Sequence, residues 1–564
     1  MVPQRPRALG RAPGWVELVA LAAAGALQTL AFIYTAHWWL PLLTTALLVW
    51  RLNGATPGRG ALLAWVYGTA WLAAGTWWLF ISLHRYGGLP AGMAVVAVAA
   101  LAAALSLYLA LAGGLYARWR RGVVWHDALL FAALWLLAEG ARQVIFTGFP
   151  WVASGYSQVD APLAVSAPFV GVMGMGALLA LLAAVLGNLG QIRPGRRWVA
   201  SASVSTALGV PALLGAPDFT RPAGEISVAL IQTRVQQDEK FKPERLPETL
   251  SWLAAALLQA EADLVVTPET AVPLLPEQLA QFAPGYWDAL VTHFTAPGRA
   301  ALVGIPLGDF DVGFTNSVVG LAAPPATPAG ASGAAPRAAP GIASGVASDA
   351  APDAAPYRYD KLHLVPFGEF VPPGFRWFTR MMNIPLGDFA RGVPNPPSFA
   401  VQDQRVGPNI CYEDLFGEEL AARFIAPAQA PTLLANVSNI AWFGDSIAIP
   451  QHLQISRLRT LELQRPMVRA TNTGPTAIID HRGVVTAALP GTVRGVLQGR
   501  VGGRDGITPY AAWAARWGHA PLWLGAVAVL AGLAVRRRSV DRRSVDTRSI
   551  DNSADGGIDR RAAP

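Results

Sequence analysis

Residues 406–424 read VGPNICYEDLFGEELAARF and contain Cys411, the single cysteine of a chain of 564 residues. A strand-like run ends at Cys411 and a helix-like run begins there. The dipole of a helix favours a thiolate at the helix N-terminus. A lone cysteine is nevertheless most often a small, inert hydrophobic residue. The stretch therefore indicates a strand-to-helix junction in an α/β domain, and Cys411 is a nucleophile only if its neighbours support one.

The composition is that of a membrane protein. Hydrophobic residues make up 53% of the chain and charged residues 14%, whereas soluble domains carry about 25% charged residues. A single cysteine excludes an intramolecular disulfide and a cysteine-based zinc cluster. The net charge of +8 lies mainly in short loops and in the C-terminal tail. We therefore expect the basic residues to orient the chain in a membrane, and we predict no nucleic-acid partner, metal or cofactor.

Eight apolar runs predict transmembrane helices, since about 20 apolar residues cross a bilayer. They are residues 15–34, 37–50, 61–83, 89–117, 123–141, 162–190, 198–215 and 517–535. Arginines gather at alternate ends of these runs, near residues 5–11, 51–59, 118–121, 193–197 and 536–538. By the positive-inside rule both termini are cytoplasmic. The rule predicts a cytoplasmic segment 1–14, seven spans in 15–215, an outer domain in 216–516, an eighth span in 517–535 and a disordered cytoplasmic tail in 536–564.

The outer domain lies in the periplasm if the bacterium is Gram-negative, and it reads as an α/β fold. Short β-rich runs occur at 226–232, 262–269, 300–306, 316–322, 432–439, 467–474 and 476–483. Helix-like runs at 244–261 and 451–465 alternate with them. Near-continuous apolar strands indicate a sheet that is covered on its faces. Residues 322–356 form an Ala/Pro/Gly/Ser tract with too little apolar surface to fold, which predicts a disordered insertion.

Three stretches of the outer domain contain candidate catalytic residues. Glu269 lies in VVTPETAVP (265–273), Lys361 in YDKLHLVPFGEFVPPG (359–374) and Cys411 in the stretch quoted first. Lys240, Lys242 and Lys361 are the only lysines of the chain, so each is notable. Separately, a loop glutamate, a surface lysine and an inert cysteine are the commoner interpretations. Together the three supply a base, a cation for an oxyanion and a nucleophile, which acyl chemistry requires.

These residues, in this order and context, resemble the catalytic set of the nitrilase (carbon–nitrogen hydrolase) superfamily over residues 225–500. With the flanking spans included, nearly the whole chain resembles a membrane-bound family of this superfamily, the apolipoprotein N-acyltransferases. Further stretches that carry this resemblance are 139–158, 361–372, 441–446, 451–454 and 465–474. It implies a polytopic helical bundle joined to an α-β-β-α sandwich.

The resemblance also assigns roles within the site. Glu269 is expected to be the general base, Lys361 the oxyanion stabiliser and Cys411 the nucleophile. Two acidic residues are expected to support them, Glu369 and Glu413. Tyr412 follows the nucleophile, and its amide N–H is a candidate second oxyanion donor.

The implied reaction is a two-step acyl transfer. A phospholipid would acylate the cysteine, and the α-amine of a diacylglyceryl-cysteine on an apolipoprotein would accept the acyl group. The implied location is the inner membrane of a bacterium, and we expect a monomer. Two alternatives stay open: a membrane-tethered amidase of the nitrilase type that acts on a small molecule, and a non-enzymatic membrane scaffold or transporter.

An apolar stretch follows the lysine motif at residues 372–389. It contains Trp377, Phe378 and Met381. We interpret these residues as an arm that contacts lipid, with burial in the core as the alternative. Within the spans, Glu139 and Arg142 are predicted to form a structural ion pair near the outer surface.

Overall fold

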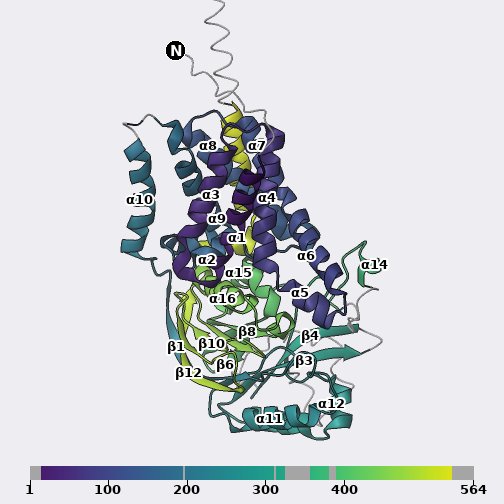
Figure 1. The fold of residues 1–564 in the computed structure, drawn as a ribbon. Helices are drawn as coiled ribbons and strands as arrows, with labels where there is room; N and C mark the ends of the chain where they lie inside the picture. Colours follow the sequence, from purple (N-terminus) through teal and green to yellow (C-terminus); the bar gives the residue numbers. More distant parts are fainter. Residues whose placement is uncertain are drawn as a thin grey trace, which may run out of the picture.

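The computed structural model describes residues 14–309, apart from 193, 195 and 196, and then residues 313–323, 356–379 and 389–535. A bundle of helices stands on a β-sandwich, and the two parts are in direct contact (Figure 1). The predictions for residues 1–13, for the tract 324–355 and for the tail 536–564 lie outside the described residues.

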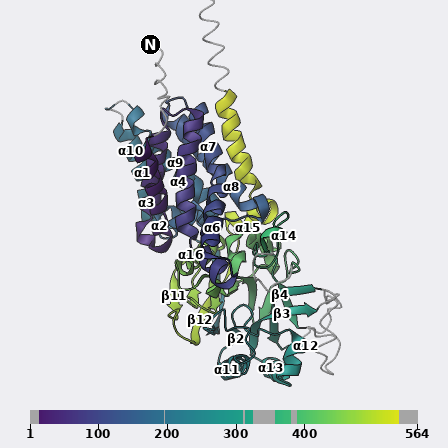
Figure 2. The ribbon, with the colours of Figure 1, turned by 45° about the vertical axis from the view of Figure 1, so that its right-hand side comes forward.

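Helices occupy all eight of the apolar runs. The bundle consists of α1 (Trp15–Leu27), α2 (Thr29–Ile33), α3 (Trp39–Leu52), α4 (Pro57–Thr76), α5 (Leu79–Ile81), α6 (Ala91–Leu105), α7 (Leu107–Trp119), α8 (Val124–Val144), α9 (Ala167–Gly187), α10 (Arg197–Leu214) and a last helix, Ala520–Val535. Figure 2 shows this last helix alongside α8, where Trp523 lies against Gly140. The helices thus come from both ends of the sequence.

Four helical segments of the described chain are long and apolar enough to cross a membrane: Trp15–Ile33, Ala91–Trp119, Val124–Thr147 and Pro162–Gly187. A fifth is added if α17 (Pro509–Trp517) and Ala520–Val535, which are bent by 90° to each other, count as one span. The remaining predicted spans correspond to α3, α4 and α10, which are not among these segments. The number of eight spans therefore stays a prediction.

Two six-stranded sheets form the sandwich, in the orders β12-β1-β2-β3-β4-β5 and β11-β10-β9-β8-β7-β6. The first contains β1 (Thr220–Gln232), β2 (Leu264–Val266), β3 (Ala300–Asp309), β4 (Gly313–Ala322), β5 (Tyr357–Asp360) and β12 (Gly495–Gly506). The second contains β6 (Phe399–Val401), β7 (Gln404–Ile410), β8 (Leu433–Ser438), β9 (Met467–Thr471), β10 (Ala477–Ile479) and β11 (Val485–Ala488). Each sheet has three parallel strands, β1-β2-β3 and β7-β8-β9, with antiparallel strands beside them.

Helices cover the outer face of each sheet, which gives the expected α-β-β-α layers. The first sheet packs against α11 (Leu246–Gln259), α12 (Pro276–Phe282) and α13 (Tyr286–Phe294). The second packs against α15 (Gly417–Ala421), α16 (Ala448–Leu463) and α17. Between the sheets, side chains such as Val228, Leu302 and Val437 form a fully buried apolar core.

The helix α16 is shared by the two parts of the molecule. On one side it lies against the second sheet, and on the other its residues Ile455, Leu458 and Leu461 join the apolar core of the bundle. It also carries a buried ion pair, since Arg459 Nη1 lies 3.0 Å from Glu462 Oε2. Glu462 Oε1 accepts a hydrogen bond of 2.6 Å from the amide of Val172 in α9. The bundle and the sandwich are therefore joined by polar as well as apolar contacts.

Candidate active site

Three strand ends bring the predicted catalytic residues together. Glu269 follows β2, Lys361 follows β5 directly, and Cys411 follows β7 directly. Lys361 Nζ lies 3.3 Å from Glu269 Oε1, and the charges of both groups act on the thiol of Cys411. The strands β2 and β5 belong to the first sheet and β7 to the second, so the site forms beyond the carboxyl ends of strands from both sheets, where ligand sites of α/β folds form.

Donors from three parts of the chain hold the carboxylate of Glu269. Besides Lys361, Asn316 Nδ2 donates to Oε1 at 2.6 Å and the amide of Asn439 donates to Oε2 at 2.8 Å. Asn316 is in β4, and Asn439 follows β8. The side chain of Glu269 is buried, so these hydrogen bonds, and not hydrogen bonds to water, fix its position.

The side chain of Glu369 completes a pair of carboxylates around Lys361. Its Oε1 accepts hydrogen bonds from Lys361 Nζ at 2.9 Å and from Asn316 Nδ2 at 2.7 Å, and its Oε2 accepts one from the amide of Val365 at 2.8 Å. Lys361 is only 1% exposed. Burial alone lowers its pKa, but Glu269 and Glu369 outweigh this and raise the pKa above the ordinary value. Lys361 is thus a permanent cation beside the thiol.

Glu413 fixes the lysine loop to the turn that carries the nucleophile. Its Oε1 accepts a hydrogen bond from the amide of Leu362 at 2.7 Å, and its Oε2 accepts bonds from the amide of Ile410 and the hydroxyl of Tyr359, both at 2.6 Å. These donors are the neighbours of Lys361 and Cys411 in sequence. Glu413 is therefore a positioning residue in this structure.

The side chain of Tyr412 reaches the bundle. Its hydroxyl donates to the carbonyl oxygen of Gly148 at 3.0 Å, and its ring packs edge-on against Phe416. Phe146 and Thr147, in the same bundle loop, have positive φ angles of 57° and 71°. Tyr412 thus connects the nucleophile turn to the bundle.

The backbone of Cys411 is in the left-handed region, with φ of 52°, which few residues other than glycine adopt. His452 Nε2 lies 3.2 Å from the carbonyl oxygen of Cys411 and contributes to holding this conformation. Burial and the charge of Glu269 raise the pKa of Cys411 to about 12, although Lys361 opposes them. The helix dipole, which the sequence predicts to lower the pKa of the thiol, does not offset burial and Glu269, because only a five-residue 3₁₀ turn, Cys411–Leu415, follows the thiol. The resting cysteine is a thiol and requires a base.

The polar site residues Asn316, Asn439, His452 and Lys240 were not predicted from the sequence as site residues. Asn316 bridges the two carboxylates. Lys240 is 5% exposed, and its Nζ donates to the backbone carbonyl oxygen of Glu269 at 3.0 Å. The scarcity of lysine was the only signal in the sequence that pointed to Lys240.

The three proposed lipid-contact residues are only partly described. Trp377 is in the short helix α14 (Arg376–Thr379) and is 61% exposed, so it is not a core residue. Nothing is described of the side chain of Phe378, and Met381 lies outside the described residues. Among the residues that the structure does describe, no group of three or more histidine, cysteine or acidic side chains is placed to bind a metal ion.

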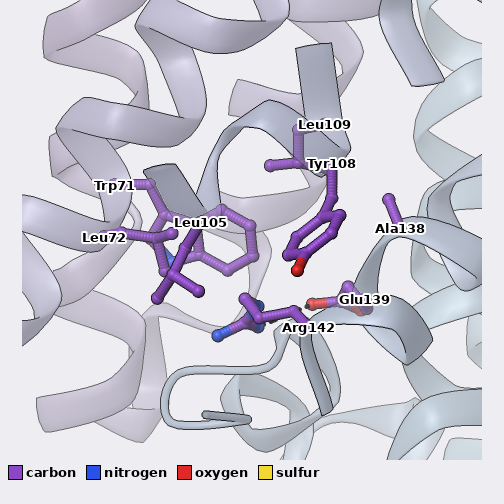
Figure 3. Close-up of a pocket in the computed structure, with 8 residues that line it drawn as sticks. All are labelled: Trp71, Leu72, Leu105, Tyr108, Leu109, Ala138, Glu139 and Arg142. Atoms are coloured by element: carbon purple, nitrogen blue, oxygen red, sulfur yellow. Dashed lines mark ion pairs between the residues drawn. The ribbon is translucent and has the colours of Figure 1, made fainter. Parts of the chain in front are cut away.

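A small pocket inside the bundle contains the predicted pair of Glu139 and Arg142 (Figure 3). Arg142 Nη2 lies 3.5 Å from Glu139 Oε1, and Arg142 Nη1 donates to the carbonyl oxygens of Phe149 and Trp151 at 3.0 and 2.6 Å. Glu139 accepts two hydrogen bonds of 2.7 Å from Ser154. The pair therefore anchors the loop after α8, as a structural role requires. The other residues that line this pocket are Trp71, Leu72, Leu105, Tyr108, Leu109 and Ala138.

Both parts of the chain match known protein families. Residues 227–502 match the carbon-nitrogen hydrolase family, and residues 24–185 match the apolipoprotein N-acyltransferase N-terminal domain. The fold and the site thus define a carbon–nitrogen hydrolase domain that is attached to a helical bundle.

Relatives that are similar over most of the chain specify the family further. The apolipoprotein N-acyltransferase of Verminephrobacter eiseniae is 51% identical over 508 residues, which are 85% of this chain and 88% of the relative. Those of Ralstonia nicotianae and Bordetella bronchiseptica are 43% and 40% identical, over 92% and 94% of this chain and 93% and 98% of the relatives. The chain belongs to the apolipoprotein N-acyltransferase family, which confirms the resemblance seen in its motifs.

Proposed function

We propose that this chain moves a fatty acyl group from a phospholipid to the α-amine of an N-terminal diacylglyceryl-cysteine on apolipoproteins. The observation that carries the proposal is the buried cation of Lys361, held by Glu269 and Glu369 beside the thiol of Cys411, in a chain whose relatives are named apolipoprotein N-acyltransferases. A thiol, a base and a fixed cation are what acyl transfer through a covalent intermediate requires.

The first half-reaction acylates the enzyme. Glu269 takes the proton of Cys411, and the sulfur attacks the ester carbonyl of the phospholipid. The negative charge that develops on the carbonyl oxygen is stabilised by Lys361 and by the amide N–H of Tyr412. The intermediate collapses, the C–O bond breaks, and Glu269 returns the proton to the lysophospholipid oxygen. A thioester on Cys411 remains.

The second half-reaction transfers the acyl group. The free α-amine of the apolipoprotein attacks the thioester, and Glu269 accepts a proton from the nitrogen. The C–S bond breaks, the amide product leaves, and the proton passes from Glu269 to the sulfur of Cys411. Two substrates react in turn at one residue, so we expect ping-pong kinetics.

The proposal includes an orientation in the membrane. The alternating arginines support eight spans with both termini in the cytoplasm, and the apolar helices support four or five of them. The sandwich would then face the periplasm at the inner membrane, where both lipid substrates are within reach. We further propose that the chain acts as a monomer.

The exposed indole of Trp377 is proposed to contact lipid near the site, together with Phe378 and Met381. Trp377→Gln is then expected to lower the rate of acylation from phospholipid vesicles several-fold and to leave the thermal unfolding temperature unchanged. An unfolded Trp377→Gln protein, or a folded one with an unchanged acylation rate, would contradict this role.

The experiment that tests the function uses membranes with an acyl-labelled phospholipid. Hydroxylamine cleaves thioesters, and Cys411 is the only cysteine, so a hydroxylamine-sensitive label on the wild-type chain must be on Cys411. We expect this label to be absent in Cys411→Ala and to move to an added diacylated lipopeptide. Active membranes without such a label would reject the acyltransferase function. Label that never moves to the lipopeptide would indicate another acceptor, such as water in an amidase-type hydrolysis.

A further inference from the structure

A second lysine is buried next to the proposed base. Lys240 lies in the turn that follows β1, and its ammonium group donates to the carbonyl oxygen of Glu269 at 3.0 Å. Throughout the described part of the chain, Lys240 takes part in no ion pair within 4 Å. Burying an ammonium group without a paired carboxylate is unfavourable. A purely structural side chain at this position would not need the charge.

The charged neighbours of Lys240 belong to the proposed site. The groups whose charges act on it are Glu269 and Cys411. The acidic residues of its own turn are paired elsewhere, Asp238 with Arg85 at 3.2 Å and Glu239 with Arg245 at 3.5 Å. Beyond Glu269, the other charged groups of the site, Lys361 and Glu369, are paired with each other at 2.9 Å. Lys240 therefore acts on the carboxylate and the thiol.

In the cluster formed by Glu269, Glu369, Lys361 and Lys240, the charges balance only when Lys240 is included, because Arg469, whose charge also acts on Cys411, is offset by Asp414. Glu269 and Glu369 carry two negative charges, and Lys361 carries one positive charge, so these three groups have a net charge of −1. Lys240 brings the sum to zero. The transfer of the proton from Cys411 to Glu269 leaves this sum unchanged, so without Lys240 the anionic intermediate and Glu369 would have only the cation of Lys361 to offset them. In a poorly solvated interior the repulsion between these two anions is large.

We propose that Lys240 is a positioning and charge-balancing residue of this site: its hydrogen bond fixes the main chain of Glu269, and its cation offsets the anion that forms when Cys411 reacts. This role rests on the acyl transfer proposed above and acts through Glu269 and the sulfur, without contact between Lys240 and substrate.

The role makes the reaction sensitive to pH. Burial lowers the pKa of Lys240 to about 8, although Glu269 and Cys411 raise it. Above this pH Lys240 loses its proton and its charge, and the site returns to a net charge of −1. The rate at which Cys411 becomes acylated is therefore expected to fall as the pH rises through about 8. Lys361 stays charged in this range, because its pKa is raised above the ordinary value.

The test measures the rate of thioester formation on Cys411 from neutral to alkaline pH, with the full chain in vesicles. We expect Lys240→Met to lower the neutral rate by about 10- to 100-fold and to abolish the fall near pH 8. At about 1.36 kcal/mol for each factor of ten, this loss corresponds to about 1.4–2.7 kcal/mol of charge repulsion. Lys240→Arg retains a cation at all these pH values and is expected to keep most of the rate and to shift the fall to higher pH. Lys242→Met is the matched control, because Lys242 is exposed in the same turn.

Two outcomes would overturn the role. One is a wild-type rate and pH profile in Lys240→Met. The other is an equal loss in Lys240→Met and Lys240→Arg with the alkaline fall unchanged, which would mean that the side chain serves only as a structural support. If Lys240→Met fails to fold, the profile of Lys240→Arg still decides. Failure of the acyl transfer itself is distinct, because the wild-type chain would then form no hydroxylamine-sensitive label at any pH.

Discussion

The carboxylate of Glu413 offers the sharpest test of how the site is held in position. Its two oxygens accept four hydrogen bonds, from the amides of Leu362, His363 and Ile410 and from the hydroxyl of Tyr359. Glu413→Gln keeps the size of the side chain but replaces one acceptor oxygen by an NH₂ group. If the NH₂ group takes the place of Oε2, Tyr359 can rotate its hydroxyl and accept, but the amide of Ile410 loses its partner.

The expected cost follows from this count. One buried N–H without an acceptor destabilises the native state by about 1–3 kcal/mol, and the opposite orientation of Gln would leave the amides of Leu362 and His363 unpaired at higher cost. The lysine loop is then free to shift relative to Cys411. A displacement of about 1 Å in a reacting group can cost about 100-fold in rate. We therefore expect Glu413→Gln to lower the unfolding temperature and to reduce thioester formation by about 100-fold.

Tyr359→Phe is the matched control for this change. It removes one donor and leaves the three backbone amides bonded to Glu413, so its loss of stability should be smaller, about 1 kcal/mol. Tryptophan fluorescence during heating reports the unfolding temperature, and hydroxylamine-sensitive labelling reports the acylation rate. A Glu413→Gln protein that matches the wild type in both measurements would refute the positioning role.

Three further predictions follow from single contacts. Glu269→Gln should increase the rate of Cys411 alkylation near neutral pH, since the charge of Glu269 raises the thiol pKa, while thioester formation is lost; slower alkylation would contradict this. Asn316→Asp places a third carboxylate against two others and should lower thioester formation by at least about tenfold, whereas an unchanged rate would show that the bridge is dispensable. Arg459→Met leaves Glu462 buried without its cation and should destabilise the chain by about 3–5 kcal/mol in thermal unfolding, and adding Glu462→Leu should recover stability; an additive double variant would refute the coupling.

The sequence predicted those elements whose pattern is strongly apolar. All seven β-rich runs contain strands, and the helix-like runs 244–261 and 451–465 contain α11 and α16. The strands β5, β6 and β11 were missed because their three or four residues do not lie in longer apolar runs, whereas the equally short β2 and β10 do. The strand β12 was missed because its sequence, GVLQGRVGGRDG, is rich in glycine and arginine. Its backbone pairing with β1, and not its side chains, stabilises it as a strand.

The sequence predicted those site residues that lie in recognisable local motifs. The structure brings Glu269, Lys361 and Cys411 together as expected, although their catalytic roles stay proposals. Asn316 could not be identified, because its partners Glu269 and Glu369 are 47 and 53 residues away and meet it through the pairing of β2, β3, β4 and β5 in one sheet. The helix-like run predicted after the cysteine is helical but interrupted, because Phe416, with φ of −109° and ψ of 76°, separates the 3₁₀ turn Cys411–Leu415 from α15.

The position of α16 has a consequence for handling this protein. This helix has no face left for water, since most of its side chains are buried between the second sheet and the bundle. A secreted fragment limited to residues 216–516 would expose Ile455, Leu458 and Leu461 together with the Arg459–Glu462 pair. Such a truncated product should aggregate when the complete polypeptide does not. Attempts to obtain a water-soluble version for crystallisation or inhibitor screening should therefore redesign this helix first and not simply delete the bundle.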